Sequence, residues 1–212
     1  SRNLVYPHIG FDEMHFIDYF DQTKILREYI TDQELYDKII KRYENRKNNE
    51  KLFFMGITMQ NHGGYTETYD NFPENYYKVG RSYTDANQYL SLVHESDEAV
   101  KNLISYFSKI DDPVEIIFFG DHQPSLNSNF YPILNGKGLT GLTEDELEKL
   151  YTVPFFIWTN YDTPEETVDI TSLDYLSTMA LERAGIELPA YNKFLADMQE
   201  VVPDINSRGY YS

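Results

Sequence analysis

The sequence predicts a layered α/β fold with a largely parallel β-sheet. Three short apolar runs have the length and composition of buried strands, and they lie at residues 52–59, 114–119 and 153–158. Helical patterns precede, separate and follow these runs, and this alternation of helices and strands is typical of α/β proteins. Because the chain has 212 residues, we expect one domain, covering residues 1–212.

Five helices are predicted from apolar side chains at helical spacing and from residues that favour helix ends. Their expected ranges are 31–45, 84–108, a short helix from 143, 172–184 and 189–200. The first and the third begin with the capping box Thr-x-x-Glu, at Thr31 and Thr143. Gly185 is placed to end the fourth helix, and Pro189 can occupy the first turn of the last. Residues 65–80, rich in Tyr and Asn, are expected to be irregular.

Charge and cysteine content exclude several kinds of function. The formal net charge is −17, and a surface this acidic repels nucleic acid and anionic lipid. A substrate that carries phosphate must therefore be held locally, by a metal ion or by a few cations. The sequence contains no Cys, which excludes disulfides, zinc fingers and thiol nucleophiles among these residues. No segment has the length and hydropathy of a membrane span, and no signal peptide is recognisable.

Polar residues follow two of the predicted strands. Asp121 and His122 come directly after the strand at 114–119, and His62 follows the strand at 52–59. Ligands bind beyond the carboxyl ends of the strands in largely parallel sheets, so we expect these residues at a functional edge. A carboxylate oxygen and an imidazole nitrogen suit Mn²⁺ or Zn²⁺ better than Ca²⁺. In the alternative interpretation, Asp121 only caps a turn, His122 is a surface residue, and His62 is a loop histidine whose hydrogen bonds are satisfied within the chain.

Two motifs that contain these histidines carry a resemblance. They are Thr-Met-Gln-Asn-His-Gly-Gly-Tyr at residues 58–65 and Phe-Phe-Gly-Asp-His-Gln-Pro at residues 118–124. In this order they resemble the lipoteichoic acid synthase family of phosphoglycerol transferases, within the alkaline phosphatase and sulfatase superfamily. Residues 1–12 and 174–185 resemble further segments of the family, so the resemblance spans nearly the whole chain.

The resemblance implies roles for four residues. Asp121 and His122 match a pair of metal ligands, with Mn²⁺ as the expected ion and Zn²⁺ or Mg²⁺ as the other candidates. His62 matches a histidine that contacts substrate, and Arg2 matches an arginine of the same pocket. The family's remaining ligands, a Glu and a Thr that is also the nucleophile, precede the matching region. We therefore expect a layered α/β/α sulfatase-like catalytic domain that is incomplete on its amino-terminal side and inactive as it stands.

In the complete protein, the resemblance implies transfer of glycerophosphate from phosphatidylglycerol to a polyglycerolphosphate or glycolipid acceptor. It also implies a place at the cell membrane of a Gram-positive-type bacterium, with this part extracellular, membrane contact through upstream transmembrane segments, and a role in cell wall biogenesis. Two alternatives remain. One is another enzyme of the superfamily: a phosphoethanolamine transferase, a phosphodiesterase or a sulfatase. The other is an extracellular binding module without catalysis.

Overall fold

The computed structural model describes residues 2–72, 83–206 and 209–211. The chain divides into two compact units. Unit 1 comprises residues 1–106 and 124–141, and unit 2 comprises residues 107–123 and 142–212. Of the stretch expected to be irregular, residues 65–72 form turns and bends without regular structure, as predicted, and residues 73–80 lie outside the described part.

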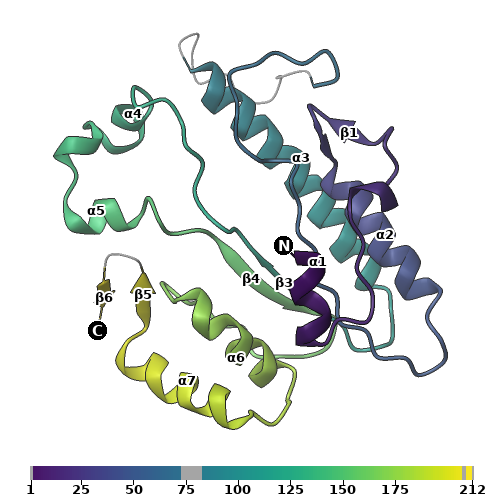
Figure 1. Ribbon diagram of the computed structural model, residues 1–212. Helices are drawn as coiled ribbons and strands as arrows, with labels where there is room; N and C mark the ends of the chain where they lie inside the picture. The colour runs from purple at the N-terminus through teal and green to yellow at the C-terminus, as the bar shows by residue number, and fades with distance from the viewer. Residues whose placement is uncertain (1, 73–82, 207–208, 212) are drawn as a thin grey trace. The chain divides into compact units, whose positions relative to one another are not determined.

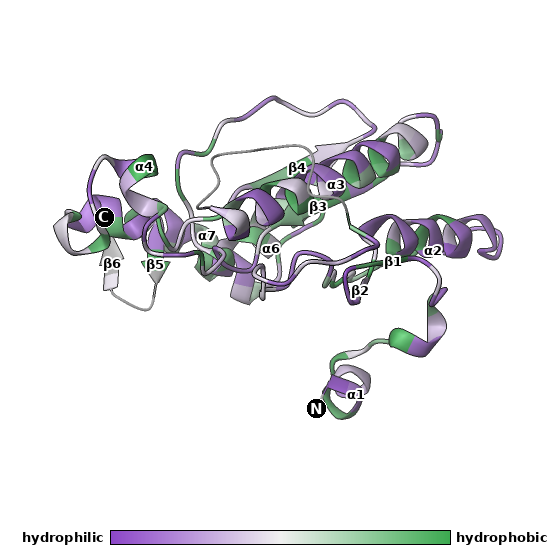
Figure 2. Cartoon of the chain, turned by 90° about the horizontal axis from the view of Figure 1, so that it is seen from above, coloured by the Kyte–Doolittle hydropathy of each residue, from purple (hydrophilic) through white to green (hydrophobic). Residues whose placement is uncertain are grey.

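Unit 1 is built on two long helices, α2 (Asp32–Glu44) and α3 (Thr84–Phe107), which lie side by side (Figures 1 and 2). Hydrogen bonds join the last part of α3 to the two ends of α2. Asn102 donates to Gln33 over 2.9 Å, and the Tyr106 hydroxyl donates to Glu44 over 3.1 Å. Both helices confirm the ranges predicted from apolar spacing. The remaining regular elements described in this unit are short: α1 (Arg2–Val5), the 3-10 helices η1 (Tyr6–Ile9), η2 (Ile17–Tyr19) and η3 (Leu139–Gly141), β1 (Ile25–Leu26), β2 (Tyr29–Ile30) and α4 (Tyr131–Asn135).

The two predicted capping boxes differ in the structure. At α5 (Glu144–Glu148) the box is complete, because Thr143 and the third residue of the helix bond each other's backbone N–H groups. At α2 only half of it forms. The Thr31 hydroxyl accepts from the backbone N–H of Glu34, whereas the Glu34 carboxylate accepts from the backbone N–H of Asp21. Glu34 thus links Asp21, which precedes the β1–β2 hairpin, to the start of α2.

One buried cluster in the described part of unit 1 contains aromatic residues from the irregular segment and one leucine of α3. Tyr65, Phe72 and Leu92 are buried together. Partly buried side chains pack against them: Leu26, Tyr69, Tyr89 and Leu126. The segment that follows the first motif is therefore held by packing although it has no regular structure.

Unit 2 contains the strand pair β3 (Glu115–Phe119) and β4 (Phe155–Thr159), hydrophobic along both strands (Figure 2). The helices α6 (Leu173–Arg183) and α7 (Ala190–Val201) form an antiparallel hairpin (Figure 1), followed by the pair β5 (Asp204–Asn206) and β6 (Gly209–Tyr211). Gly185 ends α6 as predicted, with a left-handed φ of 66°. Pro189 stands one residue before α7, at its N-cap, and not in its first turn.

The α/β class is confirmed, but two details of the predicted sheet are wrong for the described residues. The strands β3 and β4 are antiparallel, because the chain leaves β3 and returns to β4 at the same edge, where the Gly120 N–H donates to the Pro154 carbonyl over 3.2 Å. Residues 52–59 form no strand, and Phe53 is 78% exposed. An apolar run becomes a strand only where a neighbouring strand takes up its backbone hydrogen bonds, and the described residues provide none for this run. No helix in the described part is long and apolar enough to cross a membrane.

Candidate functional site

Asp121 and His122 lie at the end of β3, in unit 2, where the strand gives way to a loop. Both side chains are open to solvent, with exposed fractions of 85% for Asp121 and 74% for His122. A Cβ atom on Gly120 would lie 3.0 Å from the Cβ of Val153, so close packing against the start of β4 requires glycine immediately before the pair. The pair is thus accessible from solvent while its backbone is held against the neighbouring strand.

The two side chains are arranged as metal ligands would be. The Nδ1 atom of His122 lies 2.9 Å from the carbonyl oxygen of Gln123, so Nδ1–H donates to it and Nε2 keeps its lone pair. That Nε2 atom lies 3.6 Å from Oδ2 of Asp121. Two ligand atoms bound tetrahedrally at ~2.1 Å from one ion would be about 3.4 Å apart. The donor atoms therefore fit a divalent transition-metal ion in type and in spacing.

The described residues contain only this half of a metal site. No group of three or more His, Cys, Asp and Glu side chains that could hold a metal ion occurs within residues 2–72, 83–206 and 209–211. A structural zinc site has four protein ligands and a catalytic one has three. Asp121 and His122 can supply two of them, as the resemblance implies.

His62 lies in unit 1, in the loop 60–64 that follows the apolar run. Its side chain is exposed, and its Nδ1 atom lies 3.1 Å from the Tyr29 hydroxyl on β2. Its backbone N–H donates to the Met59 carbonyl over 3.0 Å. Gly64 adopts a left-handed φ of 91°, which glycine tolerates, and a Cβ atom at Gly63 or Gly64 would meet no atom within 4 Å. The ring of His62 is thus held on one side and borders open space.

Beneath this loop lies a cluster of buried polar side chains. Gln60 accepts from the backbone N–H of Asp32, the first residue of α2, over 3.0 Å. The Ser96 hydroxyl of α3 donates to the Asp32 carboxylate, and the Asn61 amide donates to the Ser96 hydroxyl over 2.9 Å. Burial raises the pKa of Asp32, and the hydrogen bond from Ser96 opposes that rise. These bonds join both long helices to the loop that carries His62.

The loop is also held by Arg27, which the sequence did not single out. Arg27 occupies the turn between β1 and β2 and is 5% exposed. Its guanidinium donates to the carbonyl oxygens of Gln60 over 2.8 Å, of His62 over 2.7 Å and of Gly64 over 3.4 Å. Arg27 and Tyr29 were missed because the residue pattern does not show which other segment of the chain this hairpin contacts. The signal in the sequence was a pair of charged residues, Arg27 and Glu28, between two apolar dipeptides.

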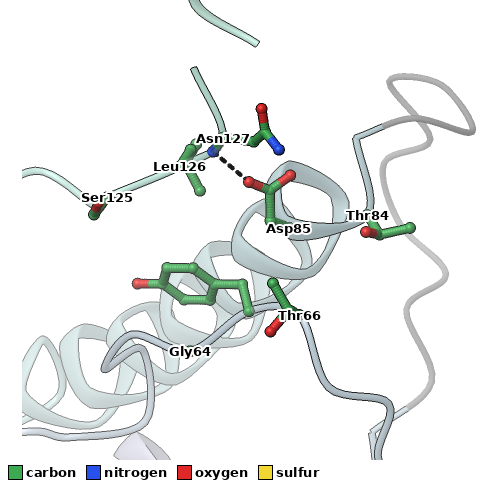
Figure 3. A pocket seen from close by; sticks show the side chains of 8 residues that line it. Gly64, Thr66, Thr84, Asp85, Ser125, Leu126 and Asn127 are labelled. Carbon is green, nitrogen blue, oxygen red and sulfur yellow. Dashed lines mark hydrogen bonds between the residues drawn. The ribbon is translucent and has the colours of Figure 1, made fainter. Parts of the chain in front are cut away.

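A pocket of about 340 Å³ begins at the same loop, within unit 1 (Figure 3). Its lining consists mainly of small polar side chains and backbone, from residues 64–66, 84–85 and 125–127. Asp85, in the first turn of α3, is buried, and its carboxylate accepts from the backbone N–H groups of Ala86 and Asn127. The hydroxyl groups of Thr66, Thr84 and Ser125 give the pocket a surface suited to a polar ligand.

Of the four site residues predicted from sequence, the structure places Asp121 next to His122 in unit 2. His62 and Arg2 belong to unit 1. Arg2 is exposed and begins α1. Its proposed contact with phosphate remains a prediction.

A match to a known protein family shows the family to which the chain belongs. The sulfatase family matches residues 1–186, a range that includes both histidine motifs and the helix α6. The chain belongs to the sulfatase family.

Two solved structures share the fold of this sulfatase-family chain. The Streptococcus pyogenes phosphoglycerol transferase GacH, determined in complex with sn-glycerol-1-phosphate, matches 98% of the chain with a TM-score of 0.70 and 19% identity. The lipoteichoic acid synthase LtaP from Listeria monocytogenes matches 88% with a TM-score of 0.65 and 21% identity. The chain covers 52% of the first structure and 47% of the second. The sulfatase-like fold implied by the resemblance is confirmed.

Two relatives from Rhizobium meliloti (strain 1021) are similar in sequence. A putative cyclic beta-1,2-glucan modification protein is 26% identical over 208 residues, 94% of this chain and 32% of the relative. The capsular polysaccharide biosynthesis protein RkpI is 33% identical over 129 residues, 60% of this chain and 22% of the relative. The sulfatase-family chain thus spans a third or less of the curated relatives that it matches.

Proposed function

We propose that the complete protein is a metal-dependent phosphoglycerol transferase, which moves glycerophosphate from phosphatidylglycerol to a growing polymer or a related acceptor. The observation that carries the proposal is the Asp121–His122 pair at the end of β3, with two ligand atoms 3.6 Å apart, in a fold shared with two transferases of this kind. Within the sulfatase family, this reading explains why the chain retains both histidine motifs.

Asp121 and His122 would bind the ion through Oδ2 and Nε2. When bound, a divalent ion such as Mn²⁺, or Zn²⁺ or Mg²⁺, polarises a phosphoryl oxygen and lowers the pKa of an attacking hydroxyl. His62 would donate a hydrogen bond to the phosphoryl group, and Arg2 would bind it through two parallel hydrogen bonds. The resemblance assigns the nucleophile to a threonine outside these residues. That threonine would form a covalent glycerophosphate intermediate as diacylglycerol leaves, and an acceptor hydroxyl would then release it.

The names of the two relatives favour a carbohydrate acceptor as a second form of the same activity. Both are named for polysaccharide modification or biosynthesis, and GacH was solved with a glycerol phosphate. In this form, a sugar hydroxyl takes the place of the polyglycerolphosphate end. The polar pocket beside Gly64 has hydroxyl and carboxylate groups that could bind such an acceptor. We place the catalytic part on the outer side of the cell membrane.

The test uses the complete protein in detergent with fluorescent phosphatidylglycerol. Release of diacylglycerol should require a divalent ion and should stop after chelation. Phosphatidylethanolamine and an aryl sulfate are the comparison substrates, because a phosphoethanolamine transferase or a sulfatase would prefer one of them. A preference for either would replace the proposal. Failure to turn over any of the three in the presence of Mn²⁺, Zn²⁺ or Mg²⁺ would favour the binding-module alternative.

A further inference from the structure

His62 and Tyr29 form a side-chain pair between the hairpin and the loop 60–64. The Tyr29 hydroxyl lies 3.1 Å from Nδ1 of His62, and the two ring centroids are 5.6 Å apart. A neutral imidazole has one donor nitrogen and one acceptor nitrogen, so the partner of Nδ1 decides which role Nε2 has. The pairing with Tyr29 therefore decides whether Nε2 of His62 donates a hydrogen bond to a ligand or accepts one from it.

Either partner can be the donor in this pair, because a Tyr hydroxyl both donates and accepts and the role of Nδ1 depends on the tautomer. Among the described residues, His62 Nδ1 is the one side-chain partner of the Tyr29 hydroxyl. In one of the two arrangements the Tyr29 hydroxyl donates its proton to Nδ1. Nδ1 then accepts, and Nε2 carries the hydrogen. An Nε2–H group attracts a phosphoryl oxygen, whereas a bare Nε2 lone pair would repel it.

Arg27 supports this arrangement at an unusual position. It is the first residue of a two-residue hairpin turn and has a φ of 55°, in the left-handed region where such turns normally place Gly, Asn or Asp. An arginine in this conformation is strained, and strain of this kind persists where the surroundings determine it. Here the surroundings are the three loop carbonyls that the guanidinium bonds and the side-chain oxygen of Gln88 on α3, 3.2 Å away.

The buried positive charge of Arg27 also has unusual surroundings. Within residues 2–72, 83–206 and 209–211, Arg27 forms no ion pair, although it is 5% exposed. Its guanidinium lies 5.6 Å from the ring centre of Tyr29, 5.5 Å from that of Tyr65 and 5.9 Å from that of Tyr69. A buried cation needs compensation, and here carbonyl dipoles and aromatic faces supply it. An exposed arginine at a hairpin turn would need none of this, so the burial points to a role in the loop.

We propose that Arg27 and Tyr29 are positioning residues for His62. Arg27 holds the backbone of residues 60–64, and Tyr29 donates to Nδ1 so that Nε2–H faces the phosphoryl group of the substrate. The proposal rests on the proposed function for its catalytic consequence. Its structural part, the tautomer of His62 and the anchoring of the loop, is tested separately from activity.

The first experiment observes the tautomer in the complete protein, labelled with ¹⁵N only at histidine. Two-bond ¹H–¹⁵N spectra should show His62 as the Nε2–H form, and the signal is identified by its loss in His62→Ala. Tyr29→Phe should convert it into a mixture of both tautomers. Tyr106→Phe removes a hydroxyl bonded to Glu44, away from the loop, and should leave the signal unchanged. An Nδ1–H form in the wild type, or an unchanged signal in Tyr29→Phe, would overturn the role of Tyr29.

The second experiment measures transfer kinetics in a double-mutant cycle. Tyr29→Phe should lower kcat about five- to tenfold with little change in KM, because the oriented donor matters most in the transition state. In the His62→Ala background, the same substitution should have no further effect. Equal losses in both backgrounds would show that Tyr29 acts independently of His62. If His62→Ala itself leaves kcat unchanged, the catalytic role of His62 is wrong. The tautomer of His62 is still decided by the spectra of the first experiment.

The third experiment tests the anchor. Arg27→Lys keeps the charge but cannot reach three carbonyls with one ammonium group. Amide hydrogen exchange should become about tenfold faster at residues 60–65 and stay unchanged in the middle of α3. Arg46→Lys is the matched control, since Arg46 also bonds a carbonyl and stacks on a tyrosine ring, both of Tyr43, outside the loop. Faster exchange throughout unit 1 would make Arg27 a general stabilising residue and overturn its assignment to the loop.

Discussion

At the scale of single residues, the two candidate histidines, His122 and His62, each have one ring nitrogen in a hydrogen bond within the chain. His122 uses Nδ1 to bond the backbone of Gln123, and His62 uses Nδ1 to bond Tyr29. In both cases Nε2 remains for a ligand. Under the proposed function, the same ring would serve as a metal ligand in one place and as a phosphate donor in the other, depending on whether the group at Nδ1 accepts or donates a proton.

The metal ligands can be tested by Asp121→Asn. The substitution keeps the shape of the side chain and removes the negative charge that a divalent ion requires. We expect Mn²⁺ affinity of the complete protein to fall by at least about tenfold and turnover to be lost with it. Calorimetric titration with Mn²⁺ measures the affinity directly. Asp111→Asn, in the turn before β3, is the control, and equal affinities for wild type and Asp121→Asn would remove Asp121 from the metal site.

The role of His62 in the proposed reaction can be tested by His62→Ala. Loss of a donor to the phosphoryl group should lower kcat/KM for phosphatidylglycerol on the order of tenfold or more. Bound metal should stay the same, because His62 is not assigned as a ligand. Metal content is measured by elemental analysis alongside the kinetics. Unchanged kinetics would show that His62 is an ordinary loop histidine without a role in the reaction.

At the scale of elements, the start of α2 places a carboxylate where burial disfavours its charge. Asp32 is buried beneath the loop 60–64 and its pKa is raised, first by that burial. When the pKa of an acid is higher in the folded state than in the unfolded state, folding binds protons. The charged carboxylate therefore destabilises the fold above its raised pKa, and this penalty disappears as the pH falls towards the unfolded pKa of about 3.9.

Asp32→Asn should remove this pH dependence. The variant should gain stability relative to wild type at neutral pH, and the gain should shrink as the pH is lowered through the raised pKa of Asp32. Urea unfolding of the chain between neutral pH and pH 4 measures the difference. Asp37→Asn, an exposed carboxylate on the same helix, is the control. A difference that grows towards acid pH would contradict the raised pKa.

The exposed apolar run 52–59 is expected to promote association between chains. Phe53 is 78% exposed and Met55 is 54% exposed, and the described residues offer this segment no strand partner. An unpaired apolar segment promotes association between chains. We expect the 212-residue chain to self-associate, and Phe53→Ser with Met55→Ser to shift it towards monomer. Sedimentation velocity checks this, with Val201→Ser as an exposed apolar control, and a monomeric wild-type chain would contradict it.

At the scale of the whole molecule, the sulfatase-family chain carries its candidate groups on two units. The candidate substrate residues His62 and Arg2 belong to unit 1, and the candidate metal ligands Asp121 and His122 belong to unit 2. The described part holds two potential ligands of one ion, and the relatives and solved structures that it matches extend well beyond it. Phosphate recognition in a chain of net charge −17 must be local, which agrees with a site built from an ion and a few donors.

We therefore expect the 212-residue chain to be inactive on its own. Two ligands should bind a divalent ion only weakly, and the nucleophile is assigned to a threonine outside these residues. The measurement is release of diacylglycerol from fluorescent phosphatidylglycerol with Mn²⁺ present, with the complete protein as positive control. Metal-dependent release by the chain alone would show that the nucleophile lies within these residues.

The sequence by itself determined the five predicted helices and the candidate residues, but not the short helices α1 and α4. The caps at Thr31 and Thr143, the stop at Gly185 and the apolar spacing of α3 act over a few residues, so they can be predicted without knowledge of the fold. The two histidine motifs likewise identified Asp121, His122 and His62 from residue type and order.

Only the tertiary structure decided the direction of β4, the exposure of residues 52–59 and the burial of Arg27. A strand's direction and pairing depend on where the chain returns after a long loop, and hydrophobic periodicity contains no information about that. Arg27 is buried because carbonyls from residues 60–64 and rings from three tyrosines surround it. Apart from Tyr29, these partners follow Arg27 by 33 residues or more along the chain, and the fold brings them to it.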